Sequence, residues 1–165
     1  MSSVAGNPST QAINTADLYD ERGEELASVP LQFQSLGGRS HFSGQARTIR
    51  CFQDNALVKA TLATPGRGQV LVVDGGGSLA TALMGDMIAE SAVANGWAGV
   101  VISGAIRDRE AIARLDLGVK ALGSNPRKSA KDGAGEVDVD VAIDGVTIRT
   151  GAMIWCDPDG ILVER

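Results

Sequence analysis

The sequence predicts a mixed α/β fold in which consecutive strands run parallel. Apolar, β-branched runs alternate with segments of helical pattern between residues 69 and 115, an order typical of parallel strands joined by right-handed crossovers. The 21 glycines and 4% aromatic residues indicate many turns and a core of small aliphatic side chains. Residues 1–11 are small and polar, so we expect a flexible N-terminal tail followed by one domain over residues 12–165.

The first half of the chain contains short elements separated by turns. In order, they are a helix over 16–26 capped by Thr15, turns over 36–44, a strand over 45–52, and a short helix capped by Asp54 or Asn55 and continuing through Thr61. Pro65-Gly66 then ends this helix before the next apolar run.

The second half begins with a buried strand, QVLVV, over 69–73. Next come a short helical piece over 79–84, a helix over 86–95, a strand over 99–103, a helix over 109–115 and a strand over 118–122. Four β-rich runs, at 137–143, 146–150, 152–156 and 161–163, follow a basic loop. Asp144-Gly145 is typical of a tight hairpin turn between the first two of these runs.

Composition argues against several classes of function. A net charge of −5 argues against direct binding of nucleic acid, which normally needs clustered Lys and Arg. The sequence shows no signal peptide and no apolar run long enough to cross a membrane, so we expect a cytoplasmic protein in which Cys51 and Cys156 are buried free thiols. His41 is the only histidine and is expected in a turn or at the surface. The chemistry must therefore depend on carboxylates, Arg and Lys, with or without a metal ion.

The segment from Gly85 to Asp108 has the pattern of an active site. A helix of about ten residues advances about 15 Å, and a strand of about five residues returns about 16 Å. Because the two lengths nearly cancel, Asp86 and the adjacent pair Arg107-Asp108 are expected to meet at one edge of the sheet. Open α/β folds place their ligand crevices at such an edge.

Each of these residues has a chemical and a structural interpretation. The helix start at Gly85-Asp86 offers backbone N–H groups to a substrate carboxylate, but Asp is also a common N-cap. Arg107 can bind a carboxylate with both arms of its guanidinium, and Asp108 offers hard oxygen ligands to Mg²⁺ or Mn²⁺. Alternatively, Arg107 and Asp108 form a surface ion pair that opens the next helix.

Two further segments carry weaker signals. The run Val70–Ser78, VLVVDGGGS, resembles loops that approach phosphates or the nucleoside of a methyl donor, but it lacks the usual glycine spacing. Its glycines can instead allow a sharp turn. The basic loop at Ser124–Glu136 is expected to be solvated, although it could bind an anion, act as a lid or contact a neighbouring subunit.

The chain as a whole, from about Ala16 to Val163, resembles the regulator of ribonuclease activity A (RraA-like) family, which includes the class II 4-hydroxy-4-methyl-2-oxoglutarate aldolases. The stretches that carry the resemblance are Leu36–Arg39, Arg50–Asn55, Val70–Ser78, Gly85–Asp108 and Ala121–Ser129. The aldolase signature of that family, an Asp, twenty residues and then Arg-Asp, is intact at Asp86, Arg107 and Asp108.

The resemblance implies a three-layer β/β/α fold of the swivelling-domain type, with a central, mostly parallel sheet, and a homotrimer with sites near subunit boundaries. It also implies residue roles. Gly85, Asp86, Met87 and Ile88 would contact a small 2-keto acid, and Arg107 would hold the carboxylate of that substrate. Asp108 would bind a divalent metal cation, Mg²⁺ or Mn²⁺, and Asp86 would orient a water bound to the metal.

The implied activity is a lyase that cleaves 4-hydroxy-4-methyl-2-oxoglutarate to pyruvate and decarboxylates oxaloacetate, since both reactions pass through a pyruvate enolate. Longer aldolases of the family have a C-terminal region whose acidic residue reaches a neighbour's site, whereas this sequence ends at Arg165. The acid/base group therefore stays open. Two alternatives remain: an inhibitor of an endoribonuclease that acts by protein contact, and a methyltransferase suggested only by VVDGGGS.

Overall fold

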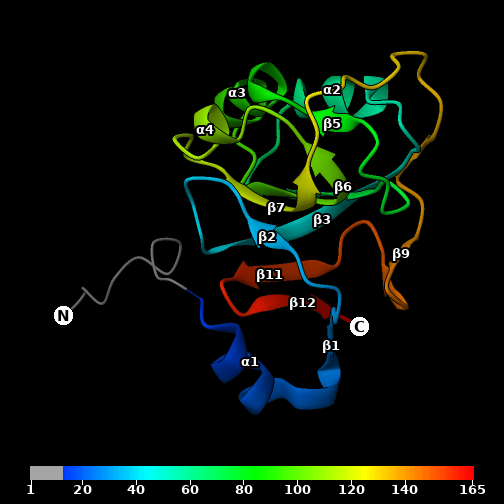
Figure 1. Ribbon diagram of the computed structural model, residues 1–165. Helices are drawn as coiled ribbons and strands as arrows, with labels where there is room; N and C mark the ends of the chain where they lie inside the picture. Colours follow the sequence, from blue (N-terminus) through cyan, green and yellow to red (C-terminus); the bar gives the residue numbers. More distant parts are fainter. Residues whose placement is uncertain (1–12) are drawn as a thin grey trace.

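The computed structural model describes residues 13–165, so the predicted tail at 1–11 lies outside the described part (Figure 1). In chain order, the elements are α1 (Thr15–Arg22), the 3-10 helix η2 (Gly23–Glu25), β1 (Leu26–Ser28), β2 (Gln34–Ser35), β3 (Phe42–Arg50), α2 (Ala56–Leu62), β4 (Val70–Asp74), β5 (Ala82–Met84), α3 (Asp86–Ala94), β6 (Gly99–Ile106), α4 (Arg109–Ile112), β7 (Gly118–Ser124), β8 (Glu136–Val137), β9 (Val141–Ile143), β10 (Val146–Ile148), β11 (Met153–Asp157) and β12 (Gly160–Glu164).

A large sheet with parallel strands at its centre organises the fold. Its strand order is β1-β12-β11-β3-β4-β6-β7-β2, with β5 beside β6 and β8 beside β3. The pairs β3–β4, β4–β6, β5–β6 and β6–β7 are parallel, and the outer pairs are antiparallel. The predicted mixed α/β architecture with a mostly parallel centre is thus confirmed.

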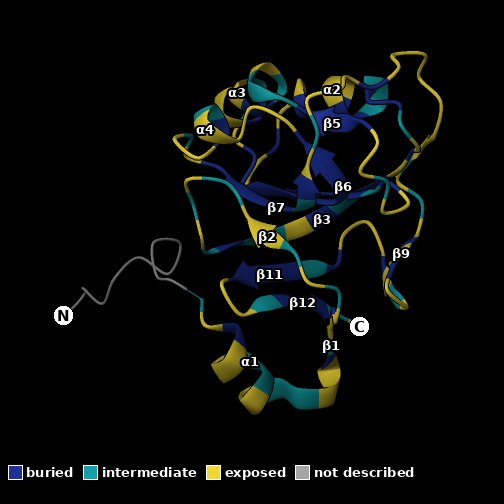
Figure 2. Cartoon of the chain, in the orientation of Figure 1, coloured by how far each residue is buried: buried dark blue, intermediate teal, exposed yellow. Residues whose placement is uncertain are grey.

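The central strands are covered on both faces. Along β4, Leu71 and Val73 belong to one apolar cluster, whereas Val70 and Val72 belong to another. Because successive side chains of a strand point to opposite faces, both faces of β4 are buried. The first cluster includes residues of α2 and α3, and the second includes residues of β9 to β12. Figure 1 shows α2, α3 and α4 together on one side of the parallel strands β6 and β7, and β11 and β12 on the other side of these strands. Figure 2 shows that the central strands are buried.

Two predictions about the N-terminal part were wrong in detail. Asn14, and not Thr15, caps α1, because its side chain accepts a hydrogen bond from the backbone N–H of Asp17. Thr15 instead lies within the helix and is buried, with its hydroxyl donating to the Asp157 carboxylate at 2.6 Å. The helix ends at Arg22, and Leu26 pairs with Glu164 as part of β1. Here a tertiary strand pairing outweighed a helical pattern.

Other boundaries moved as well. β3 begins at Phe42, inside the region expected to form turns, and residues 82–84 form strand β5 where a helical piece was predicted. The predicted strand at 137–143 is two strands, β8 and β9. The hairpin at Asp144-Gly145 is confirmed by the antiparallel pairing of β9 with β10 and by positive φ at both turn residues.

Both cysteines are free and buried, as predicted, and burial raises the pKa of the Cys51 thiol to about 11. Lys120, in contrast, was not expected in the core, yet it is only 2% exposed. Its ammonium donates to the Ser35 hydroxyl at 2.9 Å and to the Asp157 carbonyl at 2.7 Å. Burial lowers the pKa of Lys120, although the nearby Cys156 and Asp157 oppose this effect. Within residues 13–165, no helix is long and apolar enough to cross a membrane.

Candidate active site

Strand β5 brings the two ends of the Gly85–Asp108 segment together. Met84, the last residue of β5, pairs with Ile106, the last residue of β6. The backbone N–H of Arg107 donates to the Met84 carbonyl at 3.0 Å. Residues 85–86 and 107–108 therefore follow two adjacent parallel strands at the same edge of the sheet. The lengths of the helix and the strand between them predicted that they would lie together there. The pairing of β5 with β6 also brings these residues together, and the sequence did not predict it, because residues 79–84 were expected to be helical.

Asp108 contacts the start of α3 directly. Its Oδ2 accepts a hydrogen bond from the backbone N–H of Asp86 at 2.9 Å. The N-cap position of α3 is Gly85, which has no capping side chain, so a carboxylate from another element satisfies this N–H. The backbone of Asp108 is left-handed, with φ 61° and ψ 45°, a conformation that only a few residue types tolerate and that often occurs at functional sites.

Gly85 is required by close packing. A Cβ atom at this position would lie 2.8 Å from Asp108 Oδ2 and 3.2 Å from Arg107 Nε. Any larger residue would push these two side chains away from the helix start. The glycine therefore lets the carboxylate and the guanidinium approach the first turn of α3.

The alternative interpretation of Arg107 and Asp108 as a surface ion pair is wrong. None of the ion pairs within residues 13–165 includes Arg107, Asp108 or Asp86. The one hydrogen bond from the Arg107 guanidinium is a long contact of 3.4 Å to the Pro126 carbonyl. Arg107 and Asp108 are exposed and Asp86 is half-buried, so all three can reach a ligand.

A cavity of about 280 Å³ opens beside these residues. It is smaller than typical sites for drug-sized molecules, so it suits a small ligand. Its lining comes from four sources besides the Arg107-Asp108 turn: α2 and its flanks, strand β5, helix α3 with the glycine before it, and the basic loop after β7. The lining residues are Asn55, Lys59, Ala63, Ala82, Gly85, Asp86, Met87, Ile88, Ser91, Arg107, Asp108, Lys128 and Lys131. All five residues predicted to contact substrate are among them.

The basic loop is mostly exposed, as expected, but two of its lysines also line the cavity and hydrogen bonds hold the loop in place. Ser129 is buried, and its hydroxyl donates to the Ala82 carbonyl at 2.7 Å. Asp54, which was predicted as a helix cap, accepts hydrogen bonds from the backbone N–H groups of Ala56, Asp132 and Gly133. Burial alone would raise the pKa of Asp54, but these backbone donors and that of Ala134 hold it below its usual range. Asp54 thus ties the loop to the start of α2.

The glycine run after β4 does not line this cavity. Gly76 and Gly77 have positive φ, and the Gly76 N–H donates to the Asp74 carboxylate at 3.0 Å. A separate hollow is lined by Asp74 and Gly76 together with Phe52. The geometry favours the interpretation that the glycines form a sharp turn.

The donor set fits a hard divalent cation. Asp108 is exposed and uses one carboxylate oxygen for the Asp86 N–H, so its other oxygen is free to bind. Mg²⁺ commonly binds through one or two carboxylates and retains several waters. Within the described residues, no group of three or more His, Cys, Asp or Glu side chains converges, so the protein would supply few ligands.

Sequence analysis missed part of the lining. Asn55 was interpreted only as a helix cap, and Lys59 and Ala63 were given no role. The signal was present, because residues 55, 59 and 63 follow one another at a spacing of four and so share a face of a helix. What the sequence could not show is that this face meets the start of α3.

The fold and the site together define a class: an α/β protein with a small cavity at the carboxyl edge of parallel strands, where a carboxylate and a guanidinium are available to a metal ion and a ligand. The family comparison is more specific. A family model described as RraA-like, Aldolase/RraA, matches residues 15–163. The chain therefore belongs to the RraA-like family.

Solved structures agree with this assignment. The RNA-processing inhibitor RraA from Thermus thermophilis is 48% identical, with 93% of each chain covered and a TM-score of 0.89. A structure named S-adenosylmethionine: 2-dimethylmenaquinone methyltransferase from Geobacillus kaustophilus is 45% identical, with 92% of this chain and 94% of that chain covered and a TM-score of 0.91. RraAS2 from Streptomyces coelicolor, named as an unusual member of the RNase ES inhibitor RraA protein family, is 30% identical, with 90% and 76% covered and a TM-score of 0.71.

Proposed function

We propose that this protein is a divalent-metal-dependent lyase that acts on small 2-keto acids. It would cleave 4-hydroxy-4-methyl-2-oxoglutarate to pyruvate and decarboxylate oxaloacetate. The observation that carries the proposal is the state of Arg107 and Asp108: both are exposed at the rim of a small cavity, beside a helix start, and neither forms an ion pair within the described residues. The family includes aldolases, which supports the same assignment.

Each residue has a role that follows from its position. The Arg107 guanidinium would bind the substrate carboxylate with two hydrogen bonds. The first turn of α3, Gly85 to Ile88, would contact the same group through its backbone N–H groups and the positive end of the helix dipole. Asp86, whose carboxylate is half-buried at the cavity wall, would orient a water molecule for proton transfer.

Asp108 is the residue that would hold the Mg²⁺ or Mn²⁺ ion. When bound there, the ion supplies a positive charge that stabilises the negative charge developing on the pyruvate part of the substrate. The protein holds the carboxylate ready for this, since the Asp86 N–H fixes one of its oxygens and the Gly85 backbone leaves space beside it.

The chemistry balances without a redox partner. As the carbon–carbon bond breaks, its electron pair moves to the pyruvate fragment. In the aldol cleavage the C4 hydroxyl gives its proton to a water molecule or hydroxide, so the other fragment leaves as pyruvate, whereas in the decarboxylation it leaves as carbon dioxide. A proton from water then completes the pyruvate methyl group. In this proposal, a water molecule held by Asp86 would deliver that proton.

A direct assay tests the proposal. Pyruvate release is measured from oxaloacetate and from 4-hydroxy-4-methyl-2-oxoglutarate, with Mg²⁺ and with a chelator, in the wild type and in Asp108→Ala. We expect Mg²⁺-dependent release in the wild type and its loss in the variant. Equal rates in the two proteins would remove Asp108 from the site, and no release by the wild type would reject the lyase.

A second candidate function is protein inhibition of an endoribonuclease by protein contact. The name of the Thermus relative, an RNA-processing inhibitor, favours it, and the acidic net charge argues against a grip on RNA. A purified endoribonuclease captured equally by the wild type and by Arg107→Ala, together with an absence of lyase turnover, would favour this candidate. The name of the Geobacillus structure suggests a third, methyl transfer, which calorimetry with S-adenosylmethionine would test.

We also propose a three-layer β/β/α arrangement of the swivelling-domain type and a homotrimeric assembly in the cytoplasm. The layering is supported by the two apolar clusters on either face of the central strands. The trimer rests on the family resemblance, and light scattering on the purified protein would test it.

A further inference from the structure

One wall of the cavity is positively charged although the protein is acidic. The chain has four lysines, and three of them, Lys59, Lys128 and Lys131, line this cavity. All three are exposed, and none forms an ion pair within residues 13–165. With Arg107, the cavity has four cationic side chains against the carboxylates of Asp86 and Asp108. One of these carboxylates is assigned to the metal, so the remaining charge suits a ligand with more than one negative group.

Asn55, which lines the same wall, has a side-chain amide without a hydrogen-bond partner among the described residues. It lies at the N-cap position of α2 but makes no capping hydrogen bond. Its residue exposure is only 8%, and its Oδ1 is fully buried without a hydrogen-bond partner. It is the one buried side-chain oxygen or nitrogen found without a partner in the part of the chain that the structure describes. Buried polar groups almost always have partners, so this oxygen lacks a donor, which an ordered water can supply, and the amide nitrogen stays available to a ligand.

The wall is held in position by two elements. Helix α2 aligns Asn55, Lys59 and Ala63 on one face, and the small side chain of Ala63 leaves room at the end of that row. Asp54 and the buried Ser129 fix the loop that carries Lys128 and Lys131. Because the backbone of both elements is fixed before a ligand arrives, less ordering is needed on binding.

We propose that Asn55, Lys59, Lys128 and Lys131 form a second subsite, the distal wall, that binds the far carboxylate of a dicarboxylic 2-keto acid. This inference rests on the proposed function for the position of the 2-keto acid end, at Arg107 and Asp108. The Asn55 side-chain nitrogen, which makes no hydrogen bond within residues 13–165 and, unlike Oδ1, is not fully buried, donates to the distal carboxylate, and the lysines supply the charge. The distal wall makes the protein selective for dicarboxylates over monocarboxylates of similar length.

The test compares two unreactive ligands by calorimetry in Mg²⁺. 2-Oxoglutarate has a distal carboxylate and 2-ketobutyrate has none, so the ratio of their affinities isolates the distal wall. We expect the wild type to prefer 2-oxoglutarate. Lys59→Met and Lys128→Met keep most of the side-chain volume but remove a charge, and Asn55→Asp adds a repelling one. Each should lower the preference by about tenfold, as expected when a charge-assisted hydrogen bond is lost.

Arg149→Gln is the control, because it removes one exposed positive charge away from the cavity and should keep the preference. An unchanged preference in both lysine variants would overturn the distal wall, and these exposed positions decide the matter even if Asn55→Asp fails to fold. Inorganic phosphate is tested as a competitor. The proposal would also be overturned, in favour of a phosphate site, if phosphate displaced 2-oxoglutarate but not 2-ketobutyrate and bound the wild type more tightly than 2-oxoglutarate does.

The two proposals fail in different ways. A wild type that shows no lyase turnover, yet prefers 2-oxoglutarate and loses that preference in the lysine variants, would reject the proposed reaction and keep the distal wall. A wild type with full turnover whose preference is the same in all variants would keep the reaction and reject the distal wall.

Discussion

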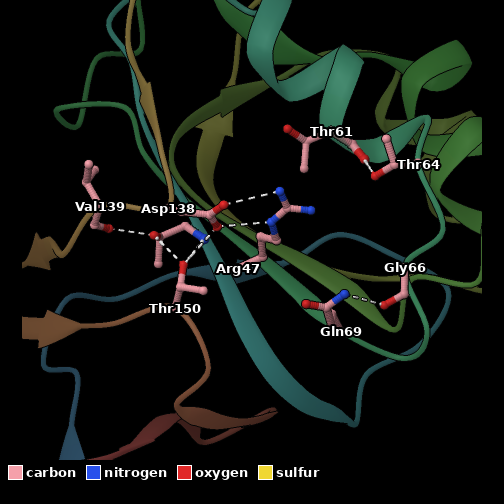
Figure 3. A network of polar contacts seen from close by, with 9 residues as sticks. Arg47, Thr61, Thr64, Gly66, Gln69, Asp138, Val139 and Thr150 are labelled. Carbon is pink, nitrogen blue, oxygen red and sulfur yellow. Dashed lines mark hydrogen bonds and ion pairs between the residues drawn. The ribbon is translucent and has the colours of Figure 1, made fainter.

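Two sets of one arginine and one aspartate, Arg47–Asp138 and Arg107–Asp108, have similar backbone features but different partners. Asp138 and Asp108 both have left-handed backbones with φ 61°. Asp138 is bound by both arms of Arg47, from Nε to Oδ1 at 3.0 Å and from Nη2 to Oδ2 at 3.2 Å, and it also accepts from the Thr150 hydroxyl at 3.1 Å (Figure 3). Asp108 and Arg107, adjacent in sequence, form no such pair and face a cavity.

The difference identifies which charges are available for binding. The Arg47–Asp138 set uses its fork geometry to join β3 to the segment after β8, so the protein itself satisfies these charges. At the second set, one residue follows the other along the chain, and their side chains contact different elements. Because Arg107 and Asp108 form no ion pair with each other, the guanidinium is available to an anion and the carboxylate to a cation. Substitutions at matched positions should therefore affect stability at the first set and ligand binding at the second.

The largest contrast is expected between Asp108→Asn and Asp138→Asn. Asparagine keeps an oxygen that can accept from the Asp86 N–H but removes the negative charge that a divalent ion needs. We expect kcat for oxaloacetate decarboxylation to fall by about 10³-fold in Asp108→Asn, since a metal supplies several kcal/mol of stabilisation. Mg²⁺ titration by calorimetry should lose its signal in the same variant. Normal Mg²⁺ binding by Asp108→Asn, or its loss in Asp138→Asn, would contradict the comparison.

The next contrast separates the two arginines. Arg107→Ala should lower kcat/KM by about 100-fold, because a substrate carboxylate would lose its bidentate partner. Arg47→Ala should leave kcat/KM within about twofold and act on folding instead. Steady-state kinetics and urea unfolding on both variants measure the two effects. If Arg47→Ala reduced kcat/KM as much as Arg107→Ala, the distinction between structural and ligand-binding arginines would fail.

A smaller effect is expected for Gly85→Ala. The added Cβ would meet Asp108 Oδ2 at 2.8 Å, and the carboxylate is the group that can move. We expect kcat to fall by about tenfold, while the free energy of unfolding changes by about 1 kcal/mol or less. Gly151→Ala is a useful control, because a Cβ there meets nothing within 4 Å, although its φ of 96° adds strain. A Gly85→Ala protein with normal kcat would show that the close approach of Asp108 is unnecessary.

The smallest effect concerns the pH dependence of the Arg47–Asp138 set. The hydrogen bond from Arg47, supported by Thr150, holds the pKa of Asp138 below its usual range despite partial burial. A lowered folded-state pKa stabilises the protein above the unfolded-state pKa, about 3.9 for Asp, and this contribution disappears as the pH falls through the folded-state value. Asp138→Ala should therefore cost up to about 1 kcal/mol at pH 7.

This cost should shrink as the pH falls below about 4, where the Asp138 carboxylate becomes protonated first in the unfolded protein and, at lower pH, in the folded protein. Urea unfolding at pH 7, 5 and 3 measures the trend. A difference between Asp138→Ala and the wild type that grows on acidification would have the wrong sign for this explanation.

Much of the central fold was predictable because its patterns are local. The apolar run that became β4, the strand that became β6 and the hairpin at Asp144-Gly145 each depend on residues close in sequence. The edge strands were not predictable in the same way. β1 and β2 are two or three residues long and are strands only because β12 and β7 lie beside them.

The candidate site also has a part that local sequence patterns predict and a part that depends on contacts between distant residues. The sequence by itself determined that Asp86 and the pair Arg107-Asp108 meet at one edge of the sheet, because a helix and a strand of matching length return the chain to its starting edge. Only the tertiary structure decided what surrounds them. Asn55 and Lys128 reach the cavity through the packing of α2 beside α3 and through a loop held by Asp54, and contacts between residues so far apart leave no periodic pattern in the sequence.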